Sequence, residues 1–285
     1  MALRINYNFQ SDFTHANLLK TEAHMNKNLE RLATGYRINR AADDAAGLFI
    51  ADQLKTYAIS LDQGTRNAQD GVSIAQIAQG ALSEVYNILN DVKAKTIQAS
   101  NTSDDTSRGQ IQQDINKLID SIAKIFEDTE FNGQNLFSAT GETTFTIHYG
   151  GRTDQELTVT SATAGATAGS GTTGVSTVTI GATLYTIDVT SQTAANATVS
   201  TVDALIKAVD DMAAKFGSAQ IELEKIISNN ETTRVNTSEA ESRIRNVDFA
   251  KEMSDFTRNQ ILMQSGMAML AQANQQPQLV MQLLR

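Results

Sequence analysis

The sequence predicts a mainly α-helical protein: an elongated hairpin of long helices, made of a terminal coiled coil and a helical bundle, with a small β-rich tip. Three observations predict this fold. Apolar residues recur at alternating spacings of four and three near both ends of the chain, and one proline is present in 285 residues. Strand-like and loop-like segments are confined to the middle. We therefore expect the first and last helices to lie antiparallel.

Composition narrows the function before any motif is considered. The chain has no cysteine, which excludes a disulfide framework, a thiolate metal site and a cysteine nucleophile. Its length suggests about two domains. The net charge of −9 argues against a general nucleic-acid binder. Residues 1–42 carry six basic and three acidic side chains and residues 241–285 carry five and four, so the acidic excess lies between them.

The N-terminal half reads as three helices. The first follows the seam Leu18, Met25, Leu29 and Leu32 and is interrupted at Gly35. Asp43 and Asp44 supply capping carboxylates for a long helix from about Ala45 to Ser100. After a turn at residues 101–104, isoleucine and leucine continue the same spacing to Ile125.

The middle of the chain changes to a period of two. An Asn-Gly pair at residues 132–133 favours a tight turn, and alternating residues around 145–149 and 157–159 predict short strands. Residues 160–174 contain only Thr, Ser, Ala and Gly, so we expect a surface loop or flexible linker. A hairpin is predicted from 175–180 and 184–189 around Gly181. Ser200, with Asp203 three positions later, predicts the start of the next helix.

The last helix, Phe249 to Arg285, has the clearest seam, and no charged residue lies between Arg258 and Arg285. A membrane span is one interpretation, but glutamine and asparagine residues from Gln260 to Gln282 and Pro277 are spread through this segment, which disfavours it. We expect a helix that packs on protein on one side and faces a neutral polar space on the other. Its candidate seam residues are Phe249, Met253, Phe256, Met263, Met267, Leu270, Leu283 and Leu284.

Long motifs at both ends of the chain resemble those of bacterial flagellins. In the first half they are ERLATGYRINRAADDAAGLFIAD (30–52), RNAQDGVSIAQIAQGAL (66–82) and FNGQNLF (131–137). In the last part they are ESRIRNVDFAKEM (241–253) and QILMQSGMAMLAQANQQPQLVMQLLR (260–285). The resemblance covers well over half of the chain, with the motifs in the right order.

The resemblance implies a subunit that self-assembles into the bacterial flagellar filament, the propeller of swimming motility. Residues 1–42 and 247–285 would form the inner coiled-coil domain that lines the filament channel. Residues 43–160 and 200–246 would form a helical rod domain with β-hairpins, and 161–199 a short variable outer insertion. The seam residues of both terminal helices would then serve the inner coiled coil and the filament interface. A hook–filament junction protein is the alternative that shares the terminal pattern.

No catalytic or metal-binding constellation stands out, and we expect no enzyme and no cofactor. The three histidines, His15, His24 and His148, lack metal-site spacing, and paired aspartates are more often helix caps or solvated faces. No residues in the sequence support the interpretation as an enzyme or as a secreted binding module.

The resemblance also implies partners and a location. The export apparatus with its chaperone, the filament cap and the hook-junction proteins would be partners, besides other copies of the chain. The N-terminus has no apolar core like that of a secretory signal, so we expect export to the extracellular filament without a cleaved signal peptide. The Thr/Ser-rich outer region is either O-glycosylated or an unmodified loop.

Recognition by a Toll-like receptor is expected to be weak. Flagellins that this receptor recognises have Arg, Glu and Leu where this chain has Asp91, Ala94 and Lys95, on either side of Lys93. A carboxylate in place of a basic anchor reverses the charge that the receptor meets.

Overall fold

The computed structural model describes residues 7–139, 141–169 and 174–283, with side chains as far as Gln275 in the last range. The chain divides into two compact units, each built from segments distant in sequence. One unit comprises Met1–Ala58 and Val235–Arg285, and the other comprises Ile59–Arg234. The long helices α2 (Ala45–Asn101) and α4 (Gln192–Arg245) each contribute to both units.

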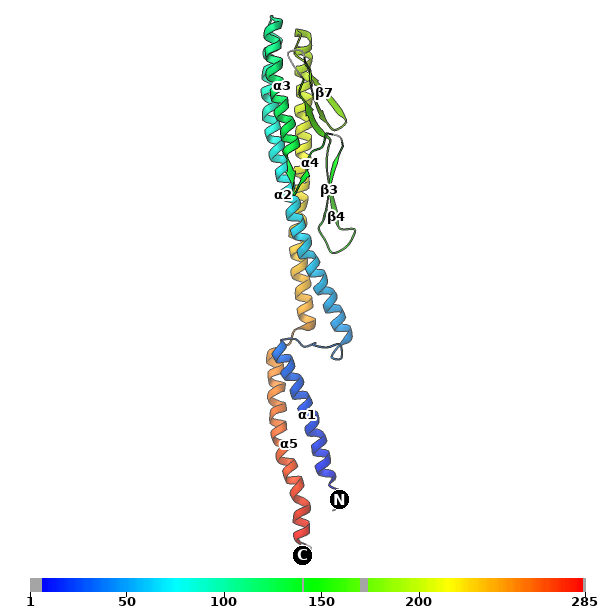
Figure 1. Ribbon diagram of the computed structural model, residues 1–285. Helices are drawn as coiled ribbons and strands as arrows, with labels where there is room; N and C mark the ends of the chain where they lie inside the picture. The colour runs from blue at the N-terminus through cyan, green and yellow to red at the C-terminus, as the bar shows by residue number, and fades with distance from the viewer. Residues whose placement is uncertain (1–6, 140, 170–173, 284–285) are drawn as a thin grey trace. The chain divides into compact units, whose positions relative to one another are not determined.

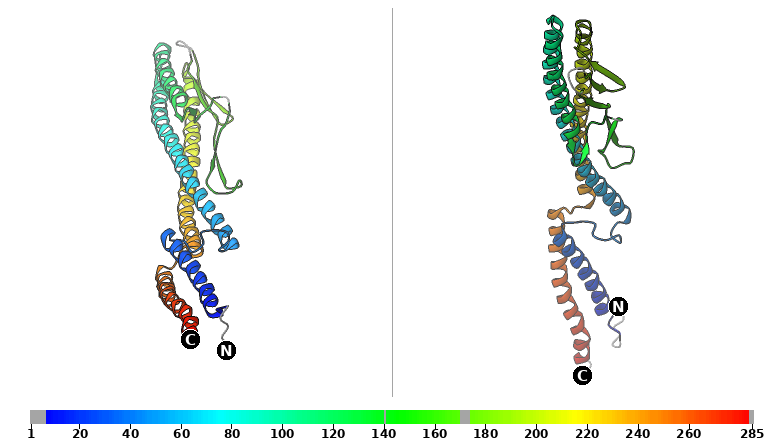
Figure 2. Two further views of the ribbon diagram at one scale, coloured as in Figure 1. Left: turned by 60° about the horizontal axis from the view of Figure 1, so that its bottom comes forward. Right: turned by 45° about the horizontal axis from the view of Figure 1, so that its top comes forward.

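The first unit is organised around α1 (Phe9–Thr34) and α5 (Phe249–Leu283). The two helices lie side by side and antiparallel, as predicted, with the start of α1 and the end of α5 at the same end of the pair (Figures 1 and 2). Asn8 marks this end, because its side chain caps α1 through Ser11 N and also donates to Ala273 O of α5 at 2.9 Å. At the opposite end, Gly35 closes α1 in the left-handed conformation with φ 75°.

The second unit is a bundle of α2, α3 (Asp105–Asp128) and α4, with strands along one side (Figure 1). One apolar core runs through it, contributed by alanines, leucines and valines of α2, isoleucines of α3 and larger residues such as Phe216 of α4. The phenylalanine rings of Phe126, Phe137 and Phe216 meet edge to face at its centre. The predicted helical bundle is therefore confirmed.

In the described residues, seven short strands form three antiparallel sheets. The strands β1 (Glu130–Phe131) and β2 (Gln134–Asn135) flank the predicted Asn-Gly turn, where Asn132 and Gly133 have φ of 52° and 76°. The predicted strands of the next hairpin are β3 (Thr143–His148) and β4 (Glu156–Ser161), paired from Thr143↔Ser161 to His148↔Glu156. The last sheet has the order β5 (Ala164–Thr167), β6 (Ser176–Ile180), β7 (Thr183–Ile187).

The prediction of a loop or linker over residues 160–174 is wrong for part of this segment, of which 170–173 lie outside the described residues. Strand β4 extends to Ser161, and β5 pairs with β6 and packs on α3. The strand is stabilised by close backbone approach instead of large side chains: Ala164 is buried, and a Cβ on Gly165 would lie 2.6 Å from the Cβ of Ala139. The composition suggested that this segment has too little apolar surface to fold. Close packing of the backbone at Ala and Gly does not need large apolar side chains.

The predicted start of α4 at Ser200 is also wrong, since the helix begins at Gln192. Ser191 supplies the cap by accepting from Ala194 N at 3.2 Å, and Thr198 donates its hydroxyl to Asp188 O at 2.7 Å. Ala195 is fully buried in this first part of the helix. Of the two carboxylates predicted to cap α2, Asp44 does so through Gly47 N, whereas Asp43 binds Asn39 N, Arg40 N and Lys27.

Candidate functional site

The α1–α5 pair brings together six of the predicted seam residues. One side chain in every three or four is at least half-buried along each helix, which defines a two-helix seam. The six predicted residues in this seam are Leu18, Met25 and Leu32 of α1 and Phe256, Met263 and Leu270 of α5.

Four other predicted residues are largely exposed on the helix pair. Leu29 is 54% exposed, Phe249 55%, Met253 49% and Met267 50%. They lie outside the seam together with further exposed apolar side chains of the two helices, namely Phe9, Phe13, Leu19, Ile261, Leu262 and Met269. We call these ten residues the outer apolar residues. The side chain of Leu283 and the whole of Leu284 lie outside the described residues.

This much exposed apolar surface on one helix pair is unusual for a protein that stays a monomer. The side chains are large, and they lie on regular helices instead of mobile loops. Burying one such side chain stabilises an assembly by about 1.5–3 kcal/mol. The helix pair therefore has the chemistry of a surface that other protein chains cover.

The segment after α1 and the segment after α4, which are distant in the sequence, meet where these two helices end. The connection after α1 and the connection after α4 form a β-bridge between Tyr36 and Asn246. Arg37 N donates to Arg245 O at 2.7 Å, and Val247 N donates to Gly35 O at 3.0 Å. The Arg245 guanidinium lies 4.6 Å from the Tyr36 ring centroid and pairs with Asp52 at 3.4 Å. These contacts join both breaks in the helices within the first unit.

In the segment predicted to meet a receptor, two lysines are already paired within the chain. Lys93 binds Asp203 of α4 at 2.6 Å, and Lys95 binds Asp114 of α3 at 2.9 Å. The hydrogen bond from Lys95 holds the pKa of the Asp114 carboxyl below its ordinary value. Asp91 and Ala94 are exposed. Within the part of the chain that the structure describes, Asp91 is thus the exposed charge of this segment that has no ion pair.

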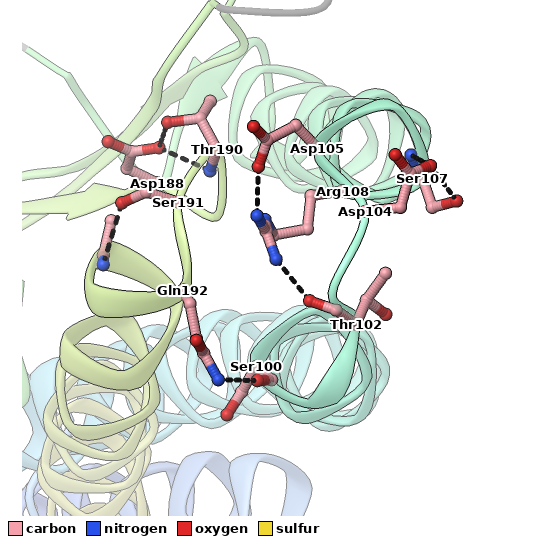
Figure 3. Close-up of polar contacts among 11 residues, drawn as sticks. Ser100, Thr102, Asp104, Asp105, Ser107, Arg108, Asp188, Thr190, Ser191 and Gln192 are labelled. Carbon is pink, nitrogen blue, oxygen red and sulfur yellow. Dashed lines mark hydrogen bonds and ion pairs between the residues drawn. The ribbon is translucent and has the colours of Figure 1, made fainter.

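A polar cluster at one end of the bundle was missed by sequence reasoning (Figure 3). Arg108, which is buried, binds Asp105 and the Thr102 carbonyl in the turn between α2 and α3. Gln192 at the start of α4 donates to Ser100 O at 3.3 Å. The cluster caps helices and joins their ends. Asp104 was the available signal, because it directly precedes α3 and caps it through Ser107 N, whereas Asp188 accepts from Thr190 N in the turn before α4.

The described part of the chain has no arrangement of residues suited to metal binding or to crossing a membrane. Over residues 7–139, 141–169 and 174–283, no three or more His, Asp or Glu side chains are grouped so as to hold a metal ion. Among the described helices, none is long and apolar enough to cross a membrane. His15 and His24 are exposed on α1, and His148 lies 3.6 Å from Glu156 on the β3–β4 hairpin.

Comparisons with known proteins agree with the motifs at both ends. Residues 5–142 match the model of the bacterial flagellin N-terminal helical region, and residues 199–284 match that of the C-terminal helical region. A flagellin of Halalkalibacterium halodurans is 39% identical over 284 residues, covering 99% of both chains. A flagellin of Bacillus subtilis is 38% identical, covering 99% of this chain and 100% of the relative. The flagellar filament 33 kDa core protein of Treponema phagedenis is 36% identical, covering 99% of both.

Proposed function

The chain belongs to the bacterial flagellin family, and we propose that its copies polymerise through the outer apolar residues of α1 and α5. Members of this family are structural subunits of the flagellar filament, not enzymes, and this chain is such a subunit. No comparison favours a hook–filament junction protein. The observation that carries the proposal is the exposure of large apolar side chains on a regular helix pair, where a neighbouring copy would cover them.

We propose that residues 1–42 and 247–285 form the inner layer of the filament. Residues 43–160 and 200–246 would form the next layer, and 161–199 the outermost part. The uncharged run of α5 between Arg258 and Arg285 supports this order, because a channel that passes unfolded chains needs a wall without strong ionic contacts. The acidic excess of residues 43–240 would face solvent.

Deletion of residues 249–285 tests the role of α5. We expect a chain that remains a monomer when sheared filament seeds are added, with the core of the second unit intact because that unit lies within Ile59–Arg234. Negative-stain microscopy measures elongation, and circular dichroism checks folding. Long filaments from the truncated chain would contradict the proposal.

Point substitutions test the outer apolar residues more sharply. Met253→Gln and Met267→Gln keep helix propensity and approximate size but remove the apolar end of an exposed side chain. We expect slower elongation from seeds for both. Ser265→Gln is the matched control, since Ser265 is exposed and polar on the same helix, and it should elongate like the wild type.

We also propose weak activation of the Toll-like receptor that recognises other flagellins. Lys93 and Lys95 are neutralised by Asp203 and Asp114, so the receptor would meet the carboxylate of Asp91. A reporter-cell assay should give a low response for the wild type. The triple change Asp91→Arg, Ala94→Glu and Lys95→Leu should raise it. Equal, strong responses from both chains would contradict this expectation.

Partners beyond the filament follow from the family alone. We propose that the flagellar export apparatus and its chaperone handle the chain without cleaving a signal peptide, and that filament cap and hook-junction proteins contact it at the filament ends. N-terminal sequencing of native filaments tests the export route. A mature chain that begins well after Met1, at a signal-peptidase site, would contradict it.

A further inference from the structure

The seam between α1 and α5 has an unusual composition, because large apolar residues alternate with small or polar ones along each helix. On α1, Leu18, Met25 and Leu32 alternate with Thr14, Thr21 and Asn28. On α5, the large residues Phe256, Met263 and Leu270 alternate with Glu252, Asn259, Gly266 and Ala273. All of these positions are buried or half-buried.

One close contact fixes how the two patterns align. A Cβ on Gly266 would lie 2.9 Å from Cδ1 of Leu18, so Leu18 packs directly on the Gly266 backbone. Near the end of α1, Arg31 Nη1 lies 3.6 Å from Glu252 Oε1, and near its start Ser11 Oγ donates to Asn274 Oδ1 at 2.8 Å. Counting outwards from Leu18 in steps of three and four sets each large residue level with a small or polar one. The layers are Ser11/Ala273, Thr14/Leu270, Leu18/Gly266, Thr21/Met263, Met25/Asn259, Asn28/Phe256 and Leu32/Glu252.

Size alone does not select this alignment. The pattern repeats every seven residues on both helices, so a slide of one heptad, about 10 Å, again sets large residues against small ones. The distinguishing features are the glycine and the charge. Only Gly266 offers a layer with no side chain, and only Glu252 sets a buried carboxylate in the seam.

Glu252 is well matched in the observed register and poorly matched in others. It is 8% exposed and faces Arg31, and the Asn28 amide nitrogen, oriented toward its acceptors, lies 3.3 Å from the same carboxylate oxygen. A one-heptad slide would set Glu252 level with Met25 or carry it past the end of α1. Removing the partner of a buried charge is strongly unfavourable. A single buried polar group is known to fix the register of coiled coils.

We propose that the Arg31–Glu252 pair and the Leu18/Gly266 contact are a register lock for the terminal helix pair. The lock decides where the outer apolar residues of α1 lie relative to those of α5, and so whether both can meet a neighbouring copy together. This step rests on the proposed role of those residues in polymerisation. Arg31, Glu252, Leu18 and Gly266 are positioning residues: they act through the alignment of two helices.

The absence of cysteine from the sequence allows the register to be measured directly. The pair Thr21→Cys and Met263→Cys occupies one layer of the observed register. The pairs Thr21→Cys with Phe256→Cys and Thr21→Cys with Leu270→Cys report a slide of one heptad in either direction. In full-length chains assembled on seeds with an excess of wild-type subunits, mild oxidation should cross-link the first pair and neither of the others.

Charge reversal then tests the lock. With Arg31→Glu or Glu252→Arg, we expect cross-links of the slid pairs to appear and seeded elongation by the variant alone to fall about tenfold or more. The double variant Arg31→Glu with Glu252→Arg should restore both readouts. The matched control is Arg258→Glu, because Arg258 pairs with Asp255 within α5 and not with α1. A second lock variant, Gly266→Ala, should shift the cross-links and be corrected by Leu18→Ala.

The outcomes separate the two proposals. If the reversed chains keep only the Thr21–Met263 cross-link, or if single and double variants are excluded from filaments equally, the register lock is overturned. Exclusion of the single variants with incorporation of the double variant supports it. If the register shifts as expected but elongation is unchanged, the lock stands and the role of the outer apolar residues in polymerisation fails.

Discussion

Gly64 of α2 lies directly against the backbone of Tyr149, which follows β3. A Cβ on Gly64 would come within 2.2 Å of the Tyr149 carbonyl oxygen. That oxygen accepts from Asn230 Nδ2 of α4 at 2.6 Å, and the neighbouring His148 carbonyl accepts from Asn67 Nδ2 of α2 at 2.8 Å. The absence of a side chain at residue 64 thus lets the end of the hairpin dock on two helices.

Gly64→Ala should therefore destabilise the protein although alanine favours helices. The methyl group must displace the Tyr149 backbone and weaken the hydrogen bonds from the Asn230 and Asn67 side chains. The expected cost is about 2 kcal/mol or more in unfolding free energy. Gly80→Ala on the same helix is the matched control, since no neighbour lies within 4 Å of its Cβ. It should stabilise by about 0.5–1 kcal/mol. Urea unfolding followed by circular dichroism measures both, and equal changes would refute the docking role.

Gln112 of α3 joins the helix to the last sheet through a fully buried amide. Its Oε1 accepts from Val189 N at 2.8 Å, and its Nε2 donates to Asn116 Oδ1 at 2.8 Å. Gln112→Ala leaves the buried Val189 N–H without this acceptor and should cost about 1–3 kcal/mol. Gln110→Ala, exposed on the same helix, should change stability by less than about 0.5 kcal/mol. Urea unfolding of both variants tests this, and a small effect at residue 112 would contradict it.

Asp104 makes the stability of the bundle depend on pH. Hydrogen bonds from the Ser107 hydroxyl and backbone lower the pKa of this carboxyl from its ordinary 3.8. A group with a lowered folded pKa stabilises the protein above its ordinary value, and that contribution is lost as the pH falls through the folded pKa. Asp104→Asn keeps a capping side chain but not the charge. Its melting temperature should be below that of the wild type at pH 7, and the difference should shrink as the pH falls through the folded pKa. A difference that is independent of pH would contradict this.

The sequence predicted the helices well because their seams are long and regular. The spacing of Leu18, Met25 and Leu32 matches a half-buried face of α1, and the isoleucines of α3 match a buried one, as expected for a helix. Turns were equally clear where one residue type has a strong backbone preference, as at Asn132 and Gly133. These signals are local, so they can be recognised without knowledge of the fold.

The errors have a different cause. Strand β5 and the start of α4 are composed of small residues. The strand depends on packing against α3, and the helix start depends on the cap from Ser191 and on the hydrogen bond from Thr198 to Asp188 O. In the seam of α5, Phe249 and Met253 fit the apolar spacing but are exposed, whereas Glu252 between them is buried. A helix with apolar residues on two faces does not reveal which face meets its partner. The polar residue that fixes the register carries no apolar signal at all.

Gly133 offers a prediction that isolates backbone conformation from packing. It has φ of 76° in the turn between β1 and β2, and no atom lies within 4 Å of a Cβ built on it. Gly133→Ala should therefore cost about 1 kcal/mol through the left-handed conformation alone. Gly141→Ala is the matched control, because its surroundings are equally open and its φ is not positive. Urea unfolding should give a loss for Gly133→Ala and little change or a small gain for Gly141→Ala. If Gly133→Ala were neutral, the turn would be adopting another conformation in solution.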